Sequence, residues 1–510
     1  MKIFPTASVK ELDAYTIANE PIASIDLMER ASQALTDAIL RNFPDASFAI
    51  FAGAGNNGGD GLAVARMLLS AGRDVEVWSV APAGRLSADC SCNLARLCRA
   101  GCAVNSVGES FSAPSLPAHC VIIDALFGSG LNKPVTGIYA DIIHFMNGAG
   151  CKVVAVDIPS GLMGEDNSPN IPENIVKANL TLTLQCPNLS FFFAENEPFV
   201  GRYEVLDIGL SREGIERLHT EYSLIEKSDI VKMLQPRARF SHKGNYGRAL
   251  LVAGSYGMAG ASLLAAKATM RSGVGLLTVN LPQGNNLIMQ SSLPEAMTLP
   301  DCCPTHISSA VATDAYTAVA VGPGLGQHTA TANALRELIE HCTCPMIVDA
   351  DALNIIAADA EWLKRLPEGS VITPHPGEFA RLAGKSTSGY EALQKARAMA
   401  RDNNICVVLK GAFTAVIAPS GECSFNSTGN PGMATGGSGD ALTGIILALM
   451  ARGYSSYDAA RIAVYVHGAA GDAAAQLLGE TAMIAGDIVE YLPAVWNSLE
   501  RLKNSDYESL

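Results

Sequence analysis

The chain has 510 residues, of which 48% are hydrophobic and 17% are charged, and its formal net charge is −14. This length predicts two to four domains, each with its own core. The negative charge argues against nucleic acid or an anionic membrane as the main partner. No apolar run reaches the roughly 18–20 residues of a membrane span, and the first twenty residues lack the apolar centre of a secretory signal. We therefore expect a cytoplasmic globular protein without nucleic-acid or membrane partners.

The thirteen cysteines show no metal-binding pattern. Several occur in close pairs, but no two Cys-x-x-Cys units combine as in a zinc ribbon. Most lie in apolar segments such as CVVLKG and GCKVVAVD. We expect them to be small buried hydrophobic residues in a reducing compartment.

Short apolar runs alternate with helical patterns through nearly the whole chain. In the first half they are SFAIFAGAG, DVEVWSV, CVIIDALFG and CKVVAVDIPSG. In the second half they are RALLVAGS, LLTVNLP, AVAVGPGLG, PMIVDADALN, SVITPHPGE and ICVVLKG. Runs that are apolar on both faces are typical of parallel strands covered by helices on both sides. The predicted fold class is therefore α/β, and the glycine, proline or aspartate after each run marks the edge where ligands bind such sheets.

One polar segment, residues 211–248, separates two glycine-rich α/β blocks and is mostly helical in pattern. We place the domain boundary near Ile225, which gives domains at residues 1–224 and 225–510. The two halves are not a repeat, because their glycine motifs differ in spacing and in the position of their acids.

The first half contains a G-x-G-x-x-G motif at residues 53–58, directly after a predicted strand and before a predicted helix. This spacing fits the dinucleotide-binding fingerprint. Two features argue against such a cofactor site. Asp60 falls in the first helical turn, where it would repel a pyrophosphate, and the next strand ends in Ser79 and Val80 instead of an acid for the ribose. An NAD-dependent oxidoreductase is therefore a disfavoured alternative.

Polar side chains follow three of the predicted strands in the first half. They are Asn57 and Asp60 in NNGGDG, Asp124 in CVIIDALFG, and Asp157 and Ser160 in VVAVDIPSG. Oxygen ligands of this kind bind cations such as K⁺ or Mg²⁺, and carboxyl groups at a strand end can carry out acid–base catalysis. Each single acid could equally be a cap or a turn residue. Three at successive strand ends, beside glycine-rich loops, indicate a site.

These blocks resemble a known family. NNGGDG, DALFGSGLNKPVTGIY and VVAVDIPSGL, with PIASIDLMERAS upstream, are similar over residues 1–220 to the N-terminal YjeF-type domain, the NAD(P)H-hydrate epimerase. The resemblance implies a Rossmann-like three-layer sandwich, K⁺ held by Asn57, Asp124 and Ser160, and Asp157 as the catalytic acid–base residue. The implied substrate-binding residues are Asn57, Gly58, Gly59, Asp60, Gly61, Gly128, Ser129, Gly130, Leu131, Asn132, Lys133, Pro134, Tyr139 and Asp157.

The second half contains the loop GNPGMATGGSGDALTG, residues 429–444, which leads into an apolar helix. Glycines at a helix start allow backbone N–H groups to surround phosphate oxygens. Asp440 would repel a phosphate there, but a kinase would use it as the base that deprotonates an acceptor hydroxyl. GGSGD resembles the G-x-G-D motif of the ribokinase-like superfamily, in which the glycine N–H groups form an anion hole and the aspartate is the base.

Four further blocks extend this resemblance. They are GSYGMAGA (254–261), VGPGLG (321–326), ITPHPGEFARL (372–382) and VVLKGAFTAV (407–416). Residues 226–500 thereby resemble the ADP/ATP-dependent NAD(P)H-hydrate dehydratase, the C-terminal YjeF-type domain, which has a ribokinase-like α/β fold. The resemblance implies a catalytic Asp440, and its other implied residues are Ala261, Gly324, His375 and Asp440 for the substrate and Lys410, Gly411, Ala412, Phe413, Thr414 and Gly439 for the adenine nucleotide.

Some polar residues of the second half keep structural alternatives. His375, between two prolines, could be a turn residue, and Lys410 could be a solvated lysine at a strand end. His467 is interpreted as a helix-packing residue and Asp472 as a cap or a water-binding residue, and neither is assigned a function. Mg²⁺ is expected with the nucleotide, with Glu378 as a candidate ligand.

Together the two resemblances predict a bifunctional enzyme of metabolite repair. Its first domain would interconvert the R and S epimers of NAD(P)H hydrate. Its second would dehydrate the S epimer at the expense of ADP, because phosphoryl transfer turns the ring hydroxyl into a good leaving group. The expected partners are the hydrated dinucleotides NADHX and NADPHX, ADP, and further copies of the chain in a homo-oligomer.

Two alternatives remain at this point. The chain could be a small-alcohol kinase fused to a non-catalytic nucleotide-binding module, which would release a stable phosphorylated product. It could also join an active dehydratase to a silent interaction module of the kind found in RNA-decapping scaffolds. Retention of Asn57, Asp124, Asp157 and Ser160 argues against the second alternative. The donor, ADP or ATP, and the preference between NADH and NADPH hydrates stay open.

Overall fold

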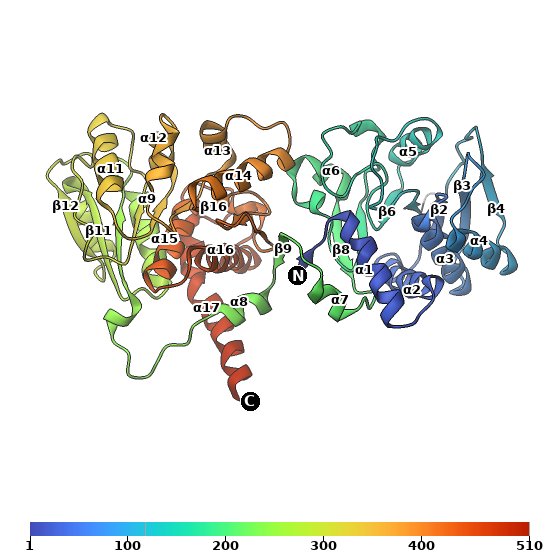
Figure 1. Ribbon diagram of the computed structural model, residues 1–510, viewed down its shortest axis with the longest axis horizontal. Helices are drawn as coiled ribbons and strands as arrows, with labels where there is room; N and C mark the ends of the chain where they lie inside the picture. The colour runs from blue at the N-terminus through green and yellow to red at the C-terminus, as the bar shows by residue number, and fades with distance from the viewer. Residues whose placement is uncertain (118, 509–510) are drawn as a thin grey trace. The chain divides into compact units, whose positions relative to one another are not determined.

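The computed structural model describes residues 1–117 and 119–508. The chain divides into two compact units, and each has a central β-sheet with helices on both faces (Figure 1). This confirms the predicted α/β class. The first unit comprises residues 1–222 with 387–390, and the second comprises residues 223–386 with 391–510.

The first unit is built on a sheet with the strand order β4-β3-β2-β5-β6-β7-β8, in which all neighbours are parallel. Its strands are β2 (Ser47–Ala52), β3 (Val75–Val80), β4 (Val104–Val107), β5 (Cys120–Ala125), β6 (Lys152–Val156), β7 (Leu180–Leu184) and β8 (Arg202–Leu206), and a short β1 (Lys2–Ile3) begins the chain. Its helices are α1 (Thr6–Asn19), α2 (Ser24–Asn42), α3 (Asn56–Ser70), α4 (Ala88–Arg99), α5 (Ile138–Gly148), α6 (Glu197–Val200) and α7 (Arg212–Arg217).

Successive residues of β2 show how this sheet is covered. Side chains alternate between the two faces of a strand, so that Ile50 packs with Leu62 of α3 and Leu97 of α4. Phe51 points to the other face, where it packs with Met146 of α5. Helices therefore cover both faces, which confirms the predicted three-layer Rossmann-like arrangement.

The strand order reverses between β2 and β5, and in open α/β sheets ligands bind at such a switch point. The chain approaches itself closely there. The Gly53 N–H donates to the carbonyl of Ala125 over 2.9 Å. A Cβ atom on Gly53 would lie 2.0 Å from the carbonyl oxygen of Leu126, and one on Gly58 would lie 1.8 Å from that of Gly53. The glycine spacing therefore serves the close packing of α3 on the sheet edge.

The second unit contains a larger sheet, in which the strands run β18-β17-β16-β15-β14-β13-β10-β11-β12, with β9 beside β18. Along this order, every neighbouring pair of strands between β16 and β12 is parallel. β17 pairs antiparallel with β16 and with β18. The strands are β9 (Tyr222–Ile225), β10 (Arg248–Val252), β11 (Leu276–Pro282), β12 (Met297–Asp301), β13 (Ala318–Val321), β14 (Met346–Val348), β15 (Val371–Ile372), β16 (Cys406–Leu409), β17 (Ala415–Ile417) and β18 (Cys423–Asn426).

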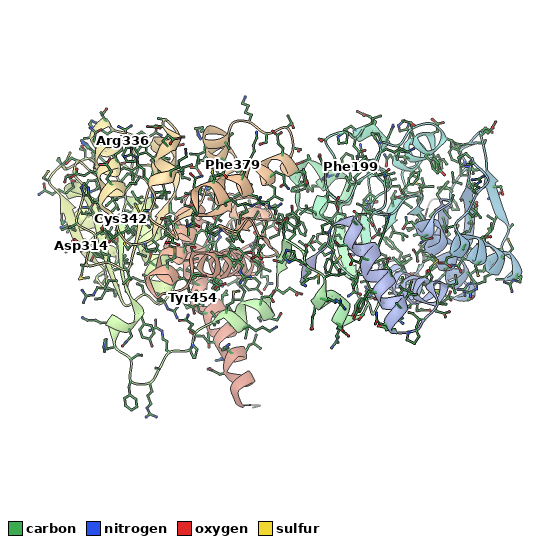
Figure 2. The ribbon with its side chains drawn as sticks, in the orientation of Figure 1. Phe199, Asp314, Arg336, Cys342, Phe379 and Tyr454 are labelled. Carbon is green, nitrogen blue, oxygen red and sulfur yellow. The ribbon has the colours of Figure 1, made fainter. Side chains whose placement is uncertain are left out.

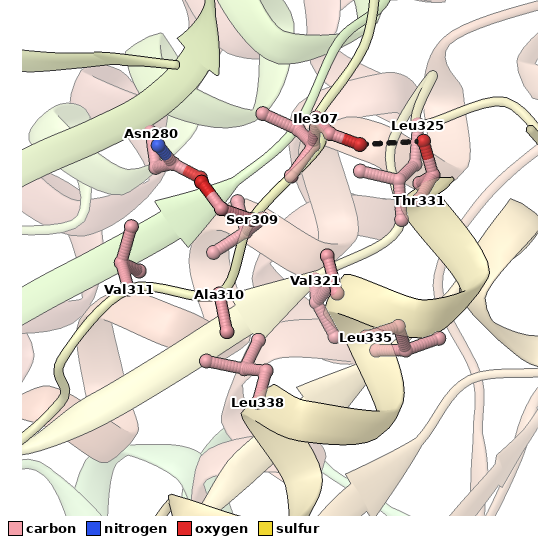
Figure 3. Close-up of a pocket in the computed structure, with 12 residues that line it drawn as sticks. Asn280, Ile307, Ser309, Ala310, Val311, Val321, Leu325, Thr331, Leu335 and Leu338 are labelled. Carbon is pink, nitrogen blue, oxygen red and sulfur yellow. Dashed lines mark hydrogen bonds between the residues drawn. The ribbon is translucent and has the colours of Figure 1, made fainter. Parts of the chain in front are cut away.

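Helices cover both faces of this sheet as well. Leu251 and Ala320 pack with Ile445 of α15 in the main core, whereas Val321 points to the opposite face, toward Leu335 of α11 (Figure 3). The helices are α8 (Lys227–Met233), α9 (Ala259–Arg271), α10 (Asn286–Ser292), α11 (Thr329–His341), α12 (Ala350–Ile356), α13 (Pro376–Ala383), α14 (Gly389–Asn403), α15 (Ser438–Ala451), α16 (Ser456–Leu478) and α17 (Ala485–Glu508). Short 3₁₀ helices lie at Pro172–Asn174, Leu189–Phe192, Ala194–Asn196, Lys243–Tyr246, Gln283–Asn285, Ala360–Arg365 and Pro431–Met433.

A cavity of about 10 Å³ lies between α11 and the sheet (Figure 3). Its wall is mostly aliphatic, and the Thr331 hydroxyl beside it donates to the carbonyl of Ile307 over 2.7 Å. The buried Oδ1 of Asn280, which also lines it, has no hydrogen-bond partner. The space can hold about one water molecule. It is a gap in the core and is too small for a nucleotide.

Every apolar run that the sequence predicted as a strand forms one. The predicted helical character of residues 211–248 is wrong in part, because β9 and an irregular stretch interrupt it. The irregular stretch is fixed where the N–H of Gln235 donates to the hydroxyl of Tyr454 over 2.8 Å (Figure 2). At this point a hydrogen bond to Tyr454, which is distant in the chain, replaces the bond within a helix that the local pattern predicted.

All thirteen cysteines are free thiols. Those that are buried are Cys90, Cys120, Cys186, Cys342, Cys406 and Cys423. The expectation of burial is therefore wrong for the others, which lie mostly in helix ends and loops. Over residues 1–117 and 119–508, no helix has both the length and the apolar character to cross a bilayer.

The contact of α15 with α9 gives a test of the packing. A Cβ atom on Gly444 would lie 2.1 Å from the carbonyl oxygen of Ala265, and Gly444 itself accepts a hydrogen bond from Thr269. We expect Gly444→Ala to lower the free energy of unfolding by about 3 kcal/mol, because backbone must move apart. Urea unfolding measures it. Gly486→Ala on α17, which meets only a side-chain tip at 3.9 Å, is the control and should not destabilise.

Candidate active sites

Asp157 follows β6 at the carboxyl edge of the first sheet. Its φ is +67°, a left-handed conformation that is strained for a residue with a side chain and occurs mainly at functional sites. Its Oδ2 accepts the N–H of Ser129 over 2.9 Å, and a Cβ atom on Gly128 would lie only 3.0 Å from that oxygen. The loop after β5 thus holds the carboxyl group in place, and a side chain at residue 128 would displace it.

Asp60 and Asp13 accompany Asp157. Asp60 lies in α3 and is 8% exposed; its Oδ1 faces the Ser32 hydroxyl at 3.3 Å. Burial raises its pKa well above the usual value, and the charge of Asp157 raises it further. Burial also raises the pKa of Asp157. For Asp13 of α1, burial and then the charge of Asp157 raise the pKa to about 6. Neighbouring carboxyl groups with raised pKa values favour acid–base chemistry.

Asp124 and Ser160 form a buried pair, and both are fully buried. The Ser160 hydroxyl donates to Asp124 Oδ1 over 2.6 Å, and the Ser160 N–H donates to Oδ2 over 2.7 Å. The carbonyl of Phe127 lies 3.2 Å from the same hydroxyl. Burial raises the pKa of Asp124 to about 6. A monovalent cation would offset this cost by neutralising the carboxylate.

Asn57, the third predicted K⁺ ligand, lies beside Gly128, where an added Cβ atom would be 3.4 Å from its Cγ. It is 9% exposed, and its Nδ2 has no hydrogen-bond partner. In the described part of the chain, no three His, Cys, Asp or Glu side chains gather as a metal site. One carboxylate with a hydroxyl, an amide and backbone carbonyls fits a hard monovalent cation such as K⁺ better than a transition metal.

The other residues predicted for the first site lie in different surroundings, some packed in the core and others exposed. Gly59 and Gly61 pack against Met28 and Ala125 and therefore serve the core more directly than a ligand. The Tyr139 hydroxyl faces the carbonyl of Val80 at 3.3 Å. Gly130, Asn132 and Lys133 are exposed, and Leu131 and Pro134 are half-buried.

In the second unit, the start of α15 meets two residues that follow β14 and β16, which lie on either side of β15. Lys410 Nζ donates to Asp349 Oδ1 over 2.9 Å, and the Thr443 hydroxyl donates to Asp349 Oδ2 over 2.7 Å. A Cβ atom on Gly439 would lie 3.2 Å from Lys410 Nζ. An ammonium group and the free N–H groups of a helix start therefore converge, which is the chemistry of a phosphate site.

Asp440 lies in the first turn of α15. Burial and then the charge of Asp349 raise its pKa to about 7, while Lys410 opposes this shift. A base works best when its pKa lies near the operating pH. Asp440 thus has the placement and the proton affinity of the predicted catalytic base.

The loops after β10 and β13 meet in front of α9. A Cβ atom on Gly324 would lie 2.9 Å from Cβ of Ala261 and 2.8 Å from the carbonyl oxygen of Met258. The Ser255 hydroxyl donates to the carbonyl of Gly324 over 2.8 Å. The N–H of Gly326, in the same loop, donates to Asp351 over 2.9 Å. The structure thus brings together two residues that the sequence assigned to the substrate.

His375 and Glu378 form a capping box at the start of α13. His375 Nδ1 accepts the N–H of Gly377 over 2.9 Å, and Glu378 accepts the N–H of His375 over 2.8 Å. The His375 side chain is 51% exposed and can still contact a ligand. Glu378 already has a structural partner, which weakens its candidacy as a metal ligand.

The adenine-nucleotide residues 410–414 form the turn between β16 and β17. The Gly411 N–H faces the Thr414 hydroxyl at 3.3 Å, and that hydroxyl faces the carbonyl of Gly411 at 3.1 Å. Gly411 and Ala412 are exposed, and Phe413 is half-buried. The threonine thus closes the turn, and the turn starts at the lysine beside the helix.

Two residues of α16 hold the glycine-rich loop. His467 Nε2 donates to the carbonyl of Ser438 over 2.9 Å. Asp472 accepts the Gly429 N–H over 3.0 Å and the Asn430 side chain over 2.9 Å. They were interpreted as a packing residue and a cap, and in the structure they fix both ends of the loop.

Comparisons with known proteins agree for both halves. A family model described as YjeF-related protein N-terminus matches residues 24–190, and one described as NAD(P)H-hydrate dehydratase matches residues 249–494. The bifunctional NAD(P)H-hydrate repair enzyme Nnr of Moorella thermoacetica is 37% identical to the chain, over 98% of the chain and 97% of that protein. The chain belongs to the family of bifunctional NAD(P)H-hydrate repair enzymes.

Other members of the family are similar. The Nnr of Escherichia coli is 34% identical over 95% of the chain and 92% of its own length. Among solved structures, the ADP/ATP-dependent NAD(P)H-hydrate dehydratase of Bacillus subtilis, co-crystallised with ATP and Mg²⁺, is 34% identical, covers 54% of the chain and 98% of its own, and has a TM-score of 0.48. The family resemblance drawn from the sequence motifs is confirmed, and a small-alcohol kinase is the less supported alternative.

Sequence reasoning missed Asp13 and Asp349 as residues near these sites. It also missed that His467 anchors the glycine-rich loop. Asp349 had a signal, because it directly follows the apolar run PMIVD at the ligand edge. Asp13 had none, since α1 carries no motif. His467 lies on α16, which follows the glycine-rich loop in the chain. Only the tertiary fold brings His467 and this loop together.

His467 makes stability depend on pH. Burial lowers its pKa from 6.5 to about 4, so the unfolded chain binds a proton at a pH where the folded protein does not. Its contribution is complete above about pH 6.5 and falls as the pH drops toward 4, by up to roughly 3 kcal/mol. Urea unfolding between pH 7.5 and 5 should show a shallower pH dependence for His467→Gln. The exposed His144, changed to Gln, should leave the dependence unaltered.

Proposed function

We propose that residues 1–224 epimerise the R and S forms of NAD(P)H hydrate and that residues 225–510 dehydrate the S form at the expense of ADP. The observation that carries this proposal is the pair of carboxyl-centred sites. Asp157 lies with the acids Asp60 and Asp13, which raise one another's proton affinity, and Asp440 lies beside an ammonium and in the first turn of a helix. The first arrangement supports proton transfer, and the second supports phosphoryl transfer.

The first site can move protons at the hydroxyl-bearing carbon of the hydrated ring. That carbon adjoins the ring nitrogen, whose lone pair can expel a protonated hydroxyl as water. Water then returns to the other face, so that configuration changes and nothing is consumed. Asp157 and Asp60, whose pKa values are both raised by burial, would release and take up the protons in these two transfers. K⁺ held by Asn57, Asp124 and Ser160 would supply positive charge for an anionic substrate.

In the second site, Asp440 would remove the proton of the substrate hydroxyl as its oxygen attacks the terminal phosphoryl group. The N–H groups of residues 436–439 and Lys410 would stabilise the charge that develops there. Ala261, Gly324 and His375 would contact the hydrated nicotinamide, and the turn 410–414 would contact the adenine nucleotide. Mg²⁺ with the nucleotide would neutralise phosphate charge. Departure of phosphate from that carbon and of a proton from the neighbouring ring carbon would then restore the double bond of the dihydronicotinamide.

The test starts from a mixture of both epimers of hydrated NADH and Mg²⁺, with ADP, with ATP or with neither. Return of the reduced-nicotinamide absorbance is followed. Complete recovery that requires a nucleotide supports both activities, and the faster nucleotide identifies the donor. Recovery that stops at the fraction of one epimer would indicate a silent first domain. A stable phosphorylated product without recovery would contradict the proposal.

Two substitutions should separate the activities. Asp440→Asn removes the base and should slow dehydration at least roughly 100-fold, while epimer interconversion, followed chromatographically without nucleotide, stays unchanged. Asp157→Asn should do the reverse, leaving dehydration of the S epimer intact. Loss of both activities in either variant would contradict the assignment to separate sites.

The pH dependence of dehydration follows from Asp440. Because burial raises its pKa to about 7, the carboxylate needed as base is depleted below that pH. The rate should therefore rise about tenfold per pH unit below 7 and level off above it. Rates measured with ADP from pH 5.5 to 8.5 check this. A profile that is flat through pH 6–7 would exclude Asp440 as the titrating base.

A cytoplasmic location and a homo-oligomeric state of the protein stay predictions.

A further inference from the structure

Helix α1 lies against the loops that carry the first site. The Thr6 N–H donates to Glu165 Oε1 over 2.6 Å, and its hydroxyl lies 2.6 Å from where a Cβ atom on Gly164 would be. These residues follow Asp157 in the chain. One turn further along, Lys10 Nζ lies 3.7 Å from the corresponding position on Gly130. The helix therefore spans from the loop after β6 to the loop after β5.

One face of α1 is turned toward the acidic centre. Lys10 and Asp13 are three residues apart and share a face of the helix, whereas Leu12 is buried in a separate apolar cluster. Asp13 and Asp157 are close enough for the charge of one to raise the pKa of the other, and Asp13 acts on Asp60 in the same way. Lys10 is exposed and lies beside Gly130, in the loop that also holds Asp157 through Ser129.

Lys10 has no partner in the structure. Its side chain is exposed, and across the described residues it forms no hydrogen bond or ion pair, although a carboxylate lies one helical turn away. A lysine that neutralised the acids for stability would be paired with one of them. An unpaired ammonium over a ligand-binding loop is instead available to an anion.

The charge balance of the site calls for such a cation. The substrate is a dinucleotide with a negatively charged diphosphate, and Asp13, Asp60 and Asp157 would repel it. Because the reacting ring must reach Asp157, which is half-buried, the diphosphate would lie farther out, toward the exposed Gly130. Lys10 lies beside Gly130.

We propose that Lys10 is a further substrate-binding residue of the epimerase site, which contacts the diphosphate of the hydrated dinucleotide, and that α1 is a wall of this site. This inference rests on the proposed epimerase activity. It concerns binding, so that the effect belongs in KM and not in the proton-transfer step, which the buried acids perform.

The experiment follows interconversion of the separated epimers of hydrated NADH by chromatography, without nucleotide. Lys10→Met should raise KM about tenfold and leave kcat within twofold, and added salt should weaken substrate binding less than in the parent protein. Lys10→Arg keeps the charge and should restore most of the affinity. Lys177→Met, at an exposed lysine of the same unit, controls for the loss of one positive charge and should not change KM.

Each outcome bears on the inference. An unchanged KM in Lys10→Met, or an equal rise in Lys177→Met, would overturn it while leaving the epimerase activity in place. A fall in kcat with KM unchanged would also overturn it, because a role in binding predicts the opposite split. Absence of interconversion in the unsubstituted protein would instead refute the proposed function on which the inference rests. Thermal unfolding of each variant shows that the comparison is between folded proteins.

Discussion

Parallel strands place their carboxyl ends at one edge of a sheet, and both candidate sites depend on this constraint. In the first unit the ends of β2, β5 and β6 carry Asn57, Asp124 and Asp157 to that edge. In the second, the ends of β14 and β16 bring Asp349 against Lys410. Because the strand ends fix where these residues lie, the loops that follow need only small adjustments of their backbone. Glycines allow these adjustments where a side chain would clash with a neighbouring backbone segment.

Burial then decides what the carboxyl groups can do. Burial raises the pKa of Asp60 and of the half-buried Asp157, so their proton affinity rises and they can exchange protons with a neutral or weakly basic group. Partial burial also raises the pKa of Asp440, but Lys410 offsets part of the effect. One site therefore concentrates acid–base groups, while the other combines a base with positive charge for a phosphoryl group. The two chemistries in one chain are complementary, since one epimer must be converted before all of the substrate can be dehydrated.

The glycine motif at residues 53–58 shows how a correct pattern can mislead. Its spacing is that of a dinucleotide fingerprint, and it lies at the switch point where such cofactors bind. In the structure, a Cβ atom on Gly53 or Gly58 would lie about 2 Å from a backbone carbonyl oxygen, so no side chain fits at either position. The expectation that Asp60 lies in the first helical turn is wrong, because α3 already begins at Asn56 and Asp60 turns toward Ser32 of α2. The acid, and not the spacing, distinguishes this site from a cofactor site.

The sequence by itself determined the α/β class, the longer strands and the acids at their ends, because continuous apolar runs and the residues after them are local features. The continuous apolar runs did not include β7, whose sequence LTLTL alternates apolar and polar residues, or β17, which has only three residues. Only the tertiary structure decided that Asp13 faces Asp157 and that His467 and Asp472 hold the glycine-rich loop. These residues lie on helices, and their partners are set by how helices pack on a sheet, which no local pattern encodes.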